Sequence, residues 1–528
     1  MNQHKNSMTK NRCNSEASTG AKASMHPSAS FVLRMALVAI AATTVGRVTA
    51  FAQSGPNTTR EVVARAAAVG ATIPPGPFQP TWDSLRANYQ VPEWFRDAKF
   101  GIFMHWGLYA VPAHASEWYA KHMYGNAGIT QWHIGKFGPP DQFGYKDFIP
   151  KFACEKFKPD DWAALFKKAG ARVVIPTAVH HDGFALWDSK VNRYNAKQMG
   201  PRRDLIGDLG QAVRKQGLKF GVSHHGIEHF TFIQPTKGLT NDLYDPAWAD
   251  FYSVADRSEA ACEKFLANWV AENVELIDQY QPDILWFDNG VNPRVFDPLK
   301  LKVAAYYYNR AAEWKKTVSL STKHDAFPSG SIMDYERRSR APKALTDYVW
   351  QVDEPVLYRF GYTEGSPIAS AGSIIGLLVD CTSKNGGVLL NISPKADGTI
   401  PDDQQELLLG IGAWLDVNGE AIYGTRPWTK PAEDKVRFTT KGDTLYAIAL
   451  GWPGTQVVIR SIGRAAVVGT TRSITLLGYP EPLTFSQEDD ALKVNLPATR
   501  PCEHAFALKI EGLLSSRAGV QPVPDPQH

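Results

Sequence analysis

The sequence predicts an α/β protein in which a (β/α)8-type barrel is followed by a C-terminal antiparallel β-sandwich. Over roughly 300 residues, short apolar runs alternate with longer helix-like segments, and this alternation favours a parallel α/β architecture. Many of the apolar runs end in a histidine or a carboxylate. From about residue 430 onward, apolar and polar residues alternate between short turns, which is typical of antiparallel sheets.

The start of the chain, residues 1–52, has the pattern of a secretory signal peptide. An apolar run at 31–45 is followed by small residues and an A-x-A site at 50–52, which predicts cleavage before Gln53. The run is short for a membrane span and is interrupted by Arg34. The sequence therefore predicts an exported protein, periplasmic or secreted, that is free of the membrane after cleavage. An uncleaved anchor is the alternative.

The barrel is predicted over residues 91–428, after an irregular lead-in at 53–90 that contains the loop signal "TIPPGP". Helix-like segments include 159–170 and 261–280, the second with apolar residues at three- and four-residue spacing. Candidate strands lie at 99–105, 171–180, 218–225, 283–288, 317–322, 331–336 and 387–393. Seven or eight such strands suit a barrel.

Functional side chains stand where these apolar runs end. They are His105, His180, His181, Ser223, His224, His225, Asp288, Asp334 and Glu336. The carboxyl ends of barrel strands converge on one face, where active sites of this fold lie. A single buried histidine is readily explained by packing, whereas five strands that each deliver a histidine or carboxylate to the same end are not. A doubly wound sheet also gathers strand ends, but no G-x-G-x-x-G or P-loop accompanies one here.

The predicted β-sandwich spans residues 429–513. Its candidate strands lie within 434–450, 455–462, 472–479, 483–497 and 504–512. The segment 514–528 is rich in proline and is predicted to be a disordered tail.

Composition narrows the function classes. Lys and Arg number 57 against 53 Asp and Glu, without a basic stripe, so the sequence does not predict nucleic-acid binding. The 15 Trp belong either to a large core or to clefts that stack sugar rings.

Three chemistries compete for the strand-end cluster. A shared metal ion is disfavoured because His180 and His181 are neighbours, and neighbouring strand residues point in opposite directions. A serine hydrolase is disfavoured because no G-x-S-x-G is present. Carboxylates, imidazoles and tryptophans together suit a glycosidase, which places two carboxylates around a sugar.

Several ordered motifs then resemble the α-L-fucosidases of glycoside hydrolase family 29. The similar stretches are "WFRDAKFGIFMHWGLYAVPAHASEWYAKHMY" (94–124), "HHDGFALWDSK" (180–190), "NAKQMGPRRDLIGDL" (195–209), "DILWFD" (283–288), "SKNGGVLLNISPKADGTIP" (383–401) and "GIGAWLDVNGEAIYGTRPW" (410–428). The resemblance covers about residues 80–430. It implies a retaining hydrolase of terminal α-L-fucosyl residues, with a fucosylated glycan as its partner and with neither metal nor cofactor.

The resemblance also implies roles for individual residues. Asp288 matches the family's nucleophile. The sugar hydroxyls are expected to contact His105, His180, His181, Glu117 and Trp118. Trp286 is expected to face the same site because it lies two residues before Asp288 on one strand. Asp182 is expected to be a structural turn residue.

The acid/base is less clearly marked, because the family carries it in a variable loop. Glu336 is the candidate, with Asp334 and Glu354 as competitors. Two departures from the family pattern concern the sugar site. Many members have Tyr-Tyr-Ser where this chain has "VSHHGIEH" (222–229), so His224 or His225 is expected to replace a tyrosine. An arginine is common at the position that Lys323 occupies here.

The remaining expectations concern specificity and assembly. Trp350 and Phe360 are expected to offer apolar surface to the C5 methyl of fucose. A related sugar such as an α-L-galactoside, or a catalytically weakened fucose-binding protein, remains an alternative. The sequence leaves a homo-oligomer open.

Overall fold

The computed structural model describes residues 57–514 except residue 468. The predicted signal peptide at 1–52 lies outside this range, and so does the predicted tail beyond residue 514. Among the described residues, no helix combines the length and the apolar character that a membrane crossing requires.

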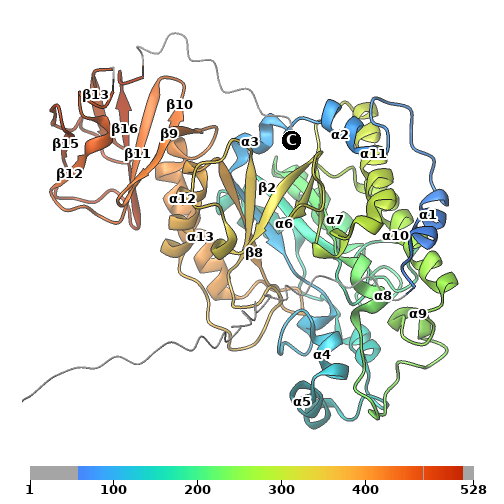
Figure 1. The fold of residues 1–528 in the computed structure, drawn as a ribbon. Helices are drawn as coiled ribbons and strands as arrows, with labels where there is room; N and C mark the ends of the chain where they lie inside the picture. Colours follow the sequence, from blue (N-terminus) through green and yellow to red (C-terminus); the bar gives the residue numbers. More distant parts are fainter. Residues whose placement is uncertain (1–56, 468, 515–528) are drawn as a thin grey trace, which may run out of the picture. The chain divides into compact units, whose positions relative to one another are not determined.

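Eight parallel strands close into a barrel, with β8 paired to β1 (Figure 1). The strands are β1 (Phe100–Met104), β2 (Val173–Val179), β3 (Lys219–His224), β4 (Ile284–Phe287), β5 (Ser319–Lys323), β6 (Ser331–Glu336), β7 (Trp350–Pro355) and β8 (Gly386–Ile392). Seven of these overlap the runs predicted from sequence. The strand β7 was not predicted, because its sequence WQVDEP lacks an apolar run.

Helices follow most of the barrel strands and pack against their outer faces. They include α6 (Pro159–Lys168), α7 (Leu205–Lys215), α10 (Glu259–Tyr280), α11 (Asp297–Glu313), α12 (Ala371–Ser383) and α13 (Asp402–Asn418). Between β5 and β6 the described chain forms no helix, and between β6 and β7 it forms only the short 3-10 turn η6 (Arg338–Arg340). Shorter helices stand in the long loop after β1, namely α4 (Tyr119–Gly125) and α5 (Ala127–Phe137), and in the loop after β3, namely α8 (His229–Phe232) and α9 (Ala249–Tyr252).

The expectation of an irregular lead-in at 53–90 is wrong for its described part, residues 57–90. It contains α1 (Arg60–Ala68) and α2 (Trp82–Asn88), and α3 (Glu93–Ala98) follows directly before β1. Thr59 and Thr81 cap the first two helices through their hydroxyl oxygens. Val62 and Val63 of α1 are fully buried, and α1 packs on α10 and α11. These short helices were missed because tertiary packing stabilises them more than their own sequence does.

The C-terminal domain is a sandwich of a five-stranded and a three-stranded antiparallel sheet. The larger sheet contains β9 (Arg426–Glu433), β10 (Val436–Lys441), β11 (Thr444–Leu450), β13 (Ser473–Leu476) and β16 (Ala505–Glu511). The smaller contains β12 (Gln456–Ile459), β14 (Phe485–Gln487) and β15 (Leu492–Asn495). The predicted boundary at residue 428 falls inside β9.

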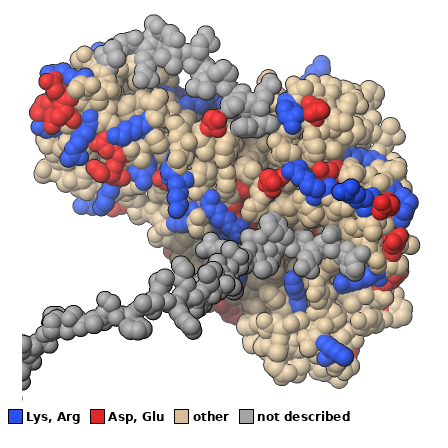
Figure 2. All heavy atoms as spheres, in the orientation of Figure 1, with Lys and Arg blue, Asp and Glu red and all other residues tan. Residues whose placement is uncertain are grey.

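Apolar side chains from both sheets form one core, which includes Phe438, Leu445, Val457, Leu492 and Phe506. The sandwich also touches α12 and α13 of the barrel. Trp414 Nε1 of α13 donates to the carbonyl of Ala505 at 2.7 Å. On the face shown in Figure 2, basic and acidic side chains are interspersed.

Candidate active site

A cavity of about 410 Å³ opens at the carboxyl ends of the barrel strands. It is lined by His105, Ser116, Glu117, Trp118, His122, His180, His181, Asp288, Asn289, Lys323, Glu336, Arg337, Arg359 and Phe360. These residues follow strands that lie far apart in the sequence, and the closed barrel brings them together.

Asp288 directly follows β4 and is held from several sides. Its Oδ1 lies 2.9 Å from Lys323 Nζ. Its Oδ2 lies 3.4 Å from His181 Nε2 and 3.5 Å from His225 Nδ1. Burial raises the pKa of Asp288, but Lys323 and the two imidazoles outweigh burial and hold the pKa well below its usual range. Asp288 is therefore a rigidly placed carboxylate that stays ionised.

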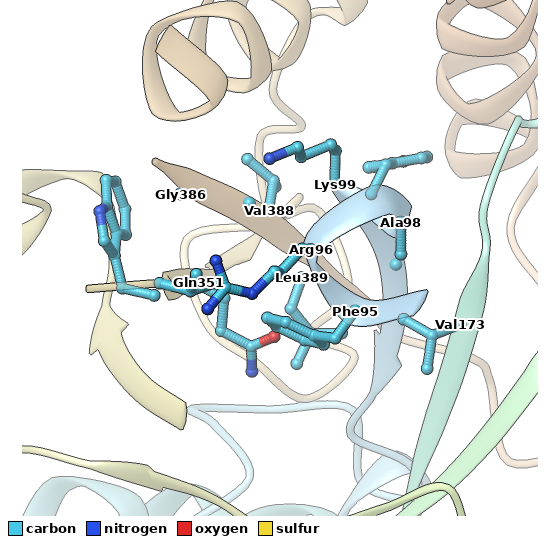
Figure 3. Close-up of a pocket in the computed structure, with 14 residues that line it drawn as sticks. Phe95, Arg96, Ala98, Lys99, Val173, Gln351, Gly386, Val388 and Leu389 are labelled. Carbon is cyan, nitrogen blue, oxygen red and sulfur yellow. The ribbon is translucent and has the colours of Figure 1, made fainter. Parts of the chain in front are cut away.

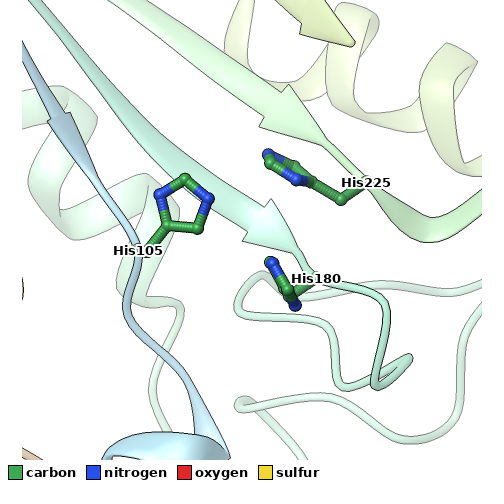
Figure 4. Close-up of side chains that lie close together, drawn as sticks. All are labelled: His105, His180 and His225. Carbon is green, nitrogen blue, oxygen red and sulfur yellow. The ribbon is translucent and has the colours of Figure 1, made fainter. Parts of the chain in front are cut away.

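Three buried imidazoles, those of His105, His180 and His225, lie close together (Figure 4). Their ring centroids are 5.1 to 5.4 Å apart. Burial lowers the pKa of all three, that of His225 to about 4. They are therefore neutral near pH 7, and a neutral imidazole can both donate a hydrogen bond to a sugar hydroxyl and accept one from it.

His181 differs from these three because both of its nitrogens face acceptors. Nδ1 lies 3.0 Å from the carbonyl oxygen of His225, and Nε2 faces Asp288. Burial lowers the pKa of His181, but Glu228 and Asp288 outweigh burial and raise the pKa to about 9. His181 is therefore a cation beside Asp288 at neutral pH.

The nitrogens and oxygens of this cluster are close enough to hold a metal ion. In two groups, His105 with His180 and His225, and His181 with His225 and Asp288, the possible ligand atoms lie within 4.8 Å of one another. Neither group contains both His180 and His181, so the sequence argument holds for that pair, but it does not exclude an ion held by only one of the two. The absence of a metal therefore stays a prediction.

Glu336, the last residue of β6, also faces the cavity. Its Oε2 lies 3.4 Å from Lys323 Nζ and 3.7 Å from Arg340 Nη1. Lys323 lowers the pKa of Glu336 and outweighs both burial and the repulsion from Asp288, which raise it. A single ammonium thus contacts both candidate catalytic carboxylates.

The two competitors of Glu336 are engaged elsewhere. Asp334 is buried under the cavity and accepts hydrogen bonds from Trp286 Nε1 and Gln351 Nε2. Glu354 accepts hydrogen bonds from the backbone and side chain of Arg338. Neither residue lines the cavity.

Glu117, Trp118 and Phe360 form another wall of the cavity. Glu117 Oε2 accepts hydrogen bonds from the backbone N–H groups of Phe360 and Gly361. Trp118 packs edge-on against His181 at 5.9 Å between ring centroids. This wall combines apolar ring surface with a carboxylate, as a sugar site requires.

The structure places His224 outside the site, so its predicted role in sugar binding is wrong. His224 is the last residue of β3, and its Nε2 lies 2.9 Å from Glu272 of α10. The next residue, His225, is the one that reaches Asp288 and the other imidazoles, because successive residues leave a strand on opposite faces. The sequence had left the choice between the two open.

The predicted role of Trp350 is also wrong. Trp350 begins β7 and therefore stands at the opposite end of the barrel, where its Nε1 donates to the carbonyl of Lys384. Trp286 points into the barrel but lies one layer below the cavity, and its ring packs against His225 at 5.2 Å. Asp182 accepts hydrogen bonds from Tyr145 and the backbone of Phe184, which fits a turn residue.

Sequence reasoning missed other residues of the site. His122, Arg337 and Arg359 line the cavity, and Asp353 lies beneath it within 3.4 Å of Lys323 Nζ. Arg337 could have been found because it directly follows Glu336. Asp353 gave no such signal, since its strand was not predicted.

At the opposite end of the barrel, a space of about 20 Å³ lies among Phe95, Arg96, Lys99, Gln351, Gly386 and other side chains near the amino ends of the strands (Figure 3). This volume is too small for a sugar ring.

Two carboxylates that share an ammonium, in a polar cavity at the carboxyl ends of barrel strands, fit the site of a glycoside hydrolase. Comparison with known proteins identifies the family. Residues 66–420 match the α-L-fucosidase family model, and residues 430–511 match the model of the α-L-fucosidase C-terminal domain. The chain belongs to the α-L-fucosidase family.

Relatives of this family cover 82–84% of the chain. The tissue α-L-fucosidase of Rattus norvegicus is 33% identical over 466 residues, which is 84% of this chain and 95% of the relative. That of Homo sapiens is 32% identical over 461 residues, with 83% and 93% covered. The structure of Thermotoga maritima α-fucosidase in complex with fucose is 33% identical, with a TM-score of 0.68, and covers 82% of this chain and 100% of its own.

Proposed function

We propose that this protein is an exported, retaining α-L-fucosidase that hydrolyses terminal α-L-fucosyl residues of glycans through a covalent glycosyl-enzyme. One observation carries the retaining mechanism. Asp288 Oδ1 and Glu336 Oε2 lie 2.9 and 3.4 Å from the same Lys323 Nζ, which bounds the distance between these two oxygens at about 6.3 Å and so favours the shorter separation of the two carboxyl groups. Retaining enzymes separate their carboxyl groups by about 5–5.5 Å and inverting enzymes by about 6.5–9.5 Å.

In the first step, Asp288 attacks the anomeric carbon of the fucosyl residue while Glu336 protonates the departing oxygen. Asp288 suits the nucleophile because it stays ionised. Glu336 must be protonated to act as an acid, although Lys323 lowers its pKa. A bound sugar excludes water and strengthens the repulsion between Glu336 and Asp288, which favours the protonated form.

In the second step, Glu336 acts as a base toward water. Ester formation removes the negative charge of Asp288, which is one of the influences that raise the pKa of Glu336. Lys323 then remains beside Glu336 and stabilises its ionised form. The loss of one charge thus turns the same residue from acid to base.

Sugar recognition is assigned to the neutral imidazoles of His105 and His180, the charged His181, and Glu117 with Trp118. Phe360 offers an apolar face suited to the C5 methyl group of fucose. The relative from Thermotoga maritima, solved in complex with fucose, supports this choice of sugar. An α-L-galactoside carries a hydroxymethyl group at C5, and the ratio of kcat/KM for the two aryl glycosides separates the two substrates.

Export is proposed from the sequence of residues 1–52. N-terminal sequencing of the protein purified from the periplasm and the medium tests it. A mature chain that begins at Gln53 is expected, and a chain that retains residues 31–45 contradicts cleavage.

Proton NMR of the first product tests the mechanism. During hydrolysis of 4-nitrophenyl α-L-fucoside, the signal of α-L-fucose is expected before that of the β-anomer, which then grows by mutarotation. Initial appearance of β-L-fucose would show inversion. No hydrolysis of this substrate, with activity on the α-L-galactoside, would move the specificity to the other sugar.

A further inference from the structure

A third carboxylate contacts the ammonium that joins Asp288 and Glu336. Asp353 of β7 is fully buried, and its Oδ2 lies 3.4 Å from Lys323 Nζ. Within residues 57–514 apart from 468, neither oxygen of Asp353 accepts a hydrogen bond of good geometry. A buried carboxylate with so few donors is costly if it is ionised.

Asp353 is held beside a second buried acid, Asp334. The two lie on the paired strands β6 and β7, where Glu336 is in register with Asp353 and Asp334 with Gln351. Asp334 Oδ1 accepts from the backbone N–H of Asp353 at 3.1 Å, and its Oδ2 accepts from Trp286 and Gln351 at 3.0 and 2.6 Å. Asp334 is thus surrounded by donors, as an anion requires, whereas Asp353 is not.

If the two acids share one proton, Asp353 is therefore the protonated residue and Asp334 the ionised one. Burial raises the pKa of both residues, and the pKa of Asp353 lies well above its usual range. A protonated Asp353 can donate to Asp334 and still turn its carbonyl oxygen toward Lys323. It would then contact the ammonium as a neutral acceptor and add no third negative charge to the two carboxylates above it.

We propose that protonated Asp353 positions the Lys323 ammonium between Asp288 and Glu336, so that the ammonium can follow the negative charge from one to the other during the reaction. The proposal rests on the proposed roles of Asp288 and Glu336. Asp353 has no exposure to the cavity, so it acts through Lys323 and is a positioning residue.

The matched variants are Asp353→Asn, Asp353→Ala and, as a control in the preceding loop, Asp347→Ala. Asn has the shape of the protonated acid, with a carbonyl oxygen for Lys323 and an N–H group for Asp334. On 4-nitrophenyl α-L-fucoside, Asp353→Ala is expected to lower kcat by about 10- to 100-fold with little change in KM. Asp353→Asn is expected to lower kcat by less than about fivefold, and Asp347→Ala to match the wild type.

A second comparison asks whether Asp353 acts through Lys323. In a Lys323→Met background, Asp353→Ala is expected to lower kcat by less than about threefold further, because the group it positions is already gone. Thermal melts show which variants fold. If Asp353→Ala does not fold, Asp353→Leu replaces it, since an apolar side chain fills the space without a buried charge.

Several outcomes overturn the proposal. Equal losses in the Asn and Ala variants would show that an ionised Asp353 is required. Wild-type kcat in Asp353→Ala, or the same loss with and without Lys323, would show that Asp353 does not position the ammonium. A failure of the proposed function is distinct, because Asp288→Gly would then remain active or the wild type would invert the anomeric centre.

Discussion

The two ends of the barrel treat buried charge in different ways. At the carboxyl ends, Lys323 and His181 are buried beside the partly exposed Asp288, and each charge faces an opposite one. At the amino ends, the ammonium of Lys99 is buried without an ion pair or hydrogen bond to the described residues, and burial lowers its pKa to about 7. The paired charges at the carboxyl ends can take part in the reaction, whereas the unpaired charge at the amino ends lowers the stability of the folded protein.

This difference predicts what substitutions do. Changes to cavity residues at the carboxyl ends are expected to alter turnover more than stability, and changes at the amino ends are expected to do the reverse.

The largest effect is expected for Asp288→Gly. Removal of the nucleophile is expected to lower kcat on 4-nitrophenyl α-L-fucoside by a factor on the order of 10⁴ or more. Azide is expected to restore turnover because it can occupy the space of the lost carboxylate, and the product is expected to be β-L-fucosyl azide. Turnover within tenfold of the wild type would contradict the role of Asp288.

Glu336→Ala is expected to have the next largest effect, a loss of about 10²- to 10⁴-fold on a substrate with a poor leaving group. A good leaving group such as 4-nitrophenolate needs little protonation, so the loss there is expected to be smaller and to be rescued by azide as α-L-fucosyl azide. Equal losses on both substrates, without rescue, would contradict the acid/base role.

Neighbouring histidines provide a matched pair. His225→Ala removes a contact with the charged Asp288 and is expected to lower kcat/KM by about 10- to 100-fold. His224→Ala leaves Glu272 without its partner and is expected to lower the free energy of unfolding by about 1–3 kcal/mol, with kcat/KM within about threefold. Steady-state kinetics and thermal melts of both variants check the pair, and a reversed outcome would contradict the placement of the two rings.

The smallest effect on turnover is expected for Lys99→Met. The pKa of Lys99 is about 7 in the folded protein, and its ordinary value is 10.5. The charged ammonium therefore destabilises the folded state most below pH 7. That cost fades as pH rises from 7 to 10.5. The variant is therefore expected to be more stable by roughly 1–3 kcal/mol near about pH 6, with the gain vanishing toward alkaline pH.

Lys99→Arg keeps the charge and serves as the control for this variant. Denaturant unfolding at several pH values measures both. A gain that grows with rising pH would have the wrong sign and would contradict the account of the amino end.

Much of this architecture could be predicted because strand ends carry a clear signal. His105, His180 and Asp288 each close an apolar run, and a barrel brings such ends together. The strand β7 was not predicted, because buried Gln351 and Asp353 interrupt its apolar pattern. Which of His224 and His225 faces inward could not be predicted, because that choice depends on the residue at which β3 ends.

The contacts of Lys323 lay beyond sequence reasoning for another reason. Its three carboxylates come from β4, β6 and β7, and their common distance to one ammonium is set by strand register. Sequence order carries no such information. The resemblance had implied retention, but the closeness of Asp288 and Glu336 to one ammonium came only from the structure.

Trapping of the glycosyl-enzyme tests the central claim most directly. The protein is treated with 2-deoxy-2-fluoro-L-fucosyl fluoride, which slows hydrolysis of the intermediate, and peptides are then mapped by mass spectrometry. The account predicts one added deoxyfluorofucosyl group per chain, in ester linkage to Asp288. A label on Glu336 or Glu228, or inactivation without any covalent label, would contradict it.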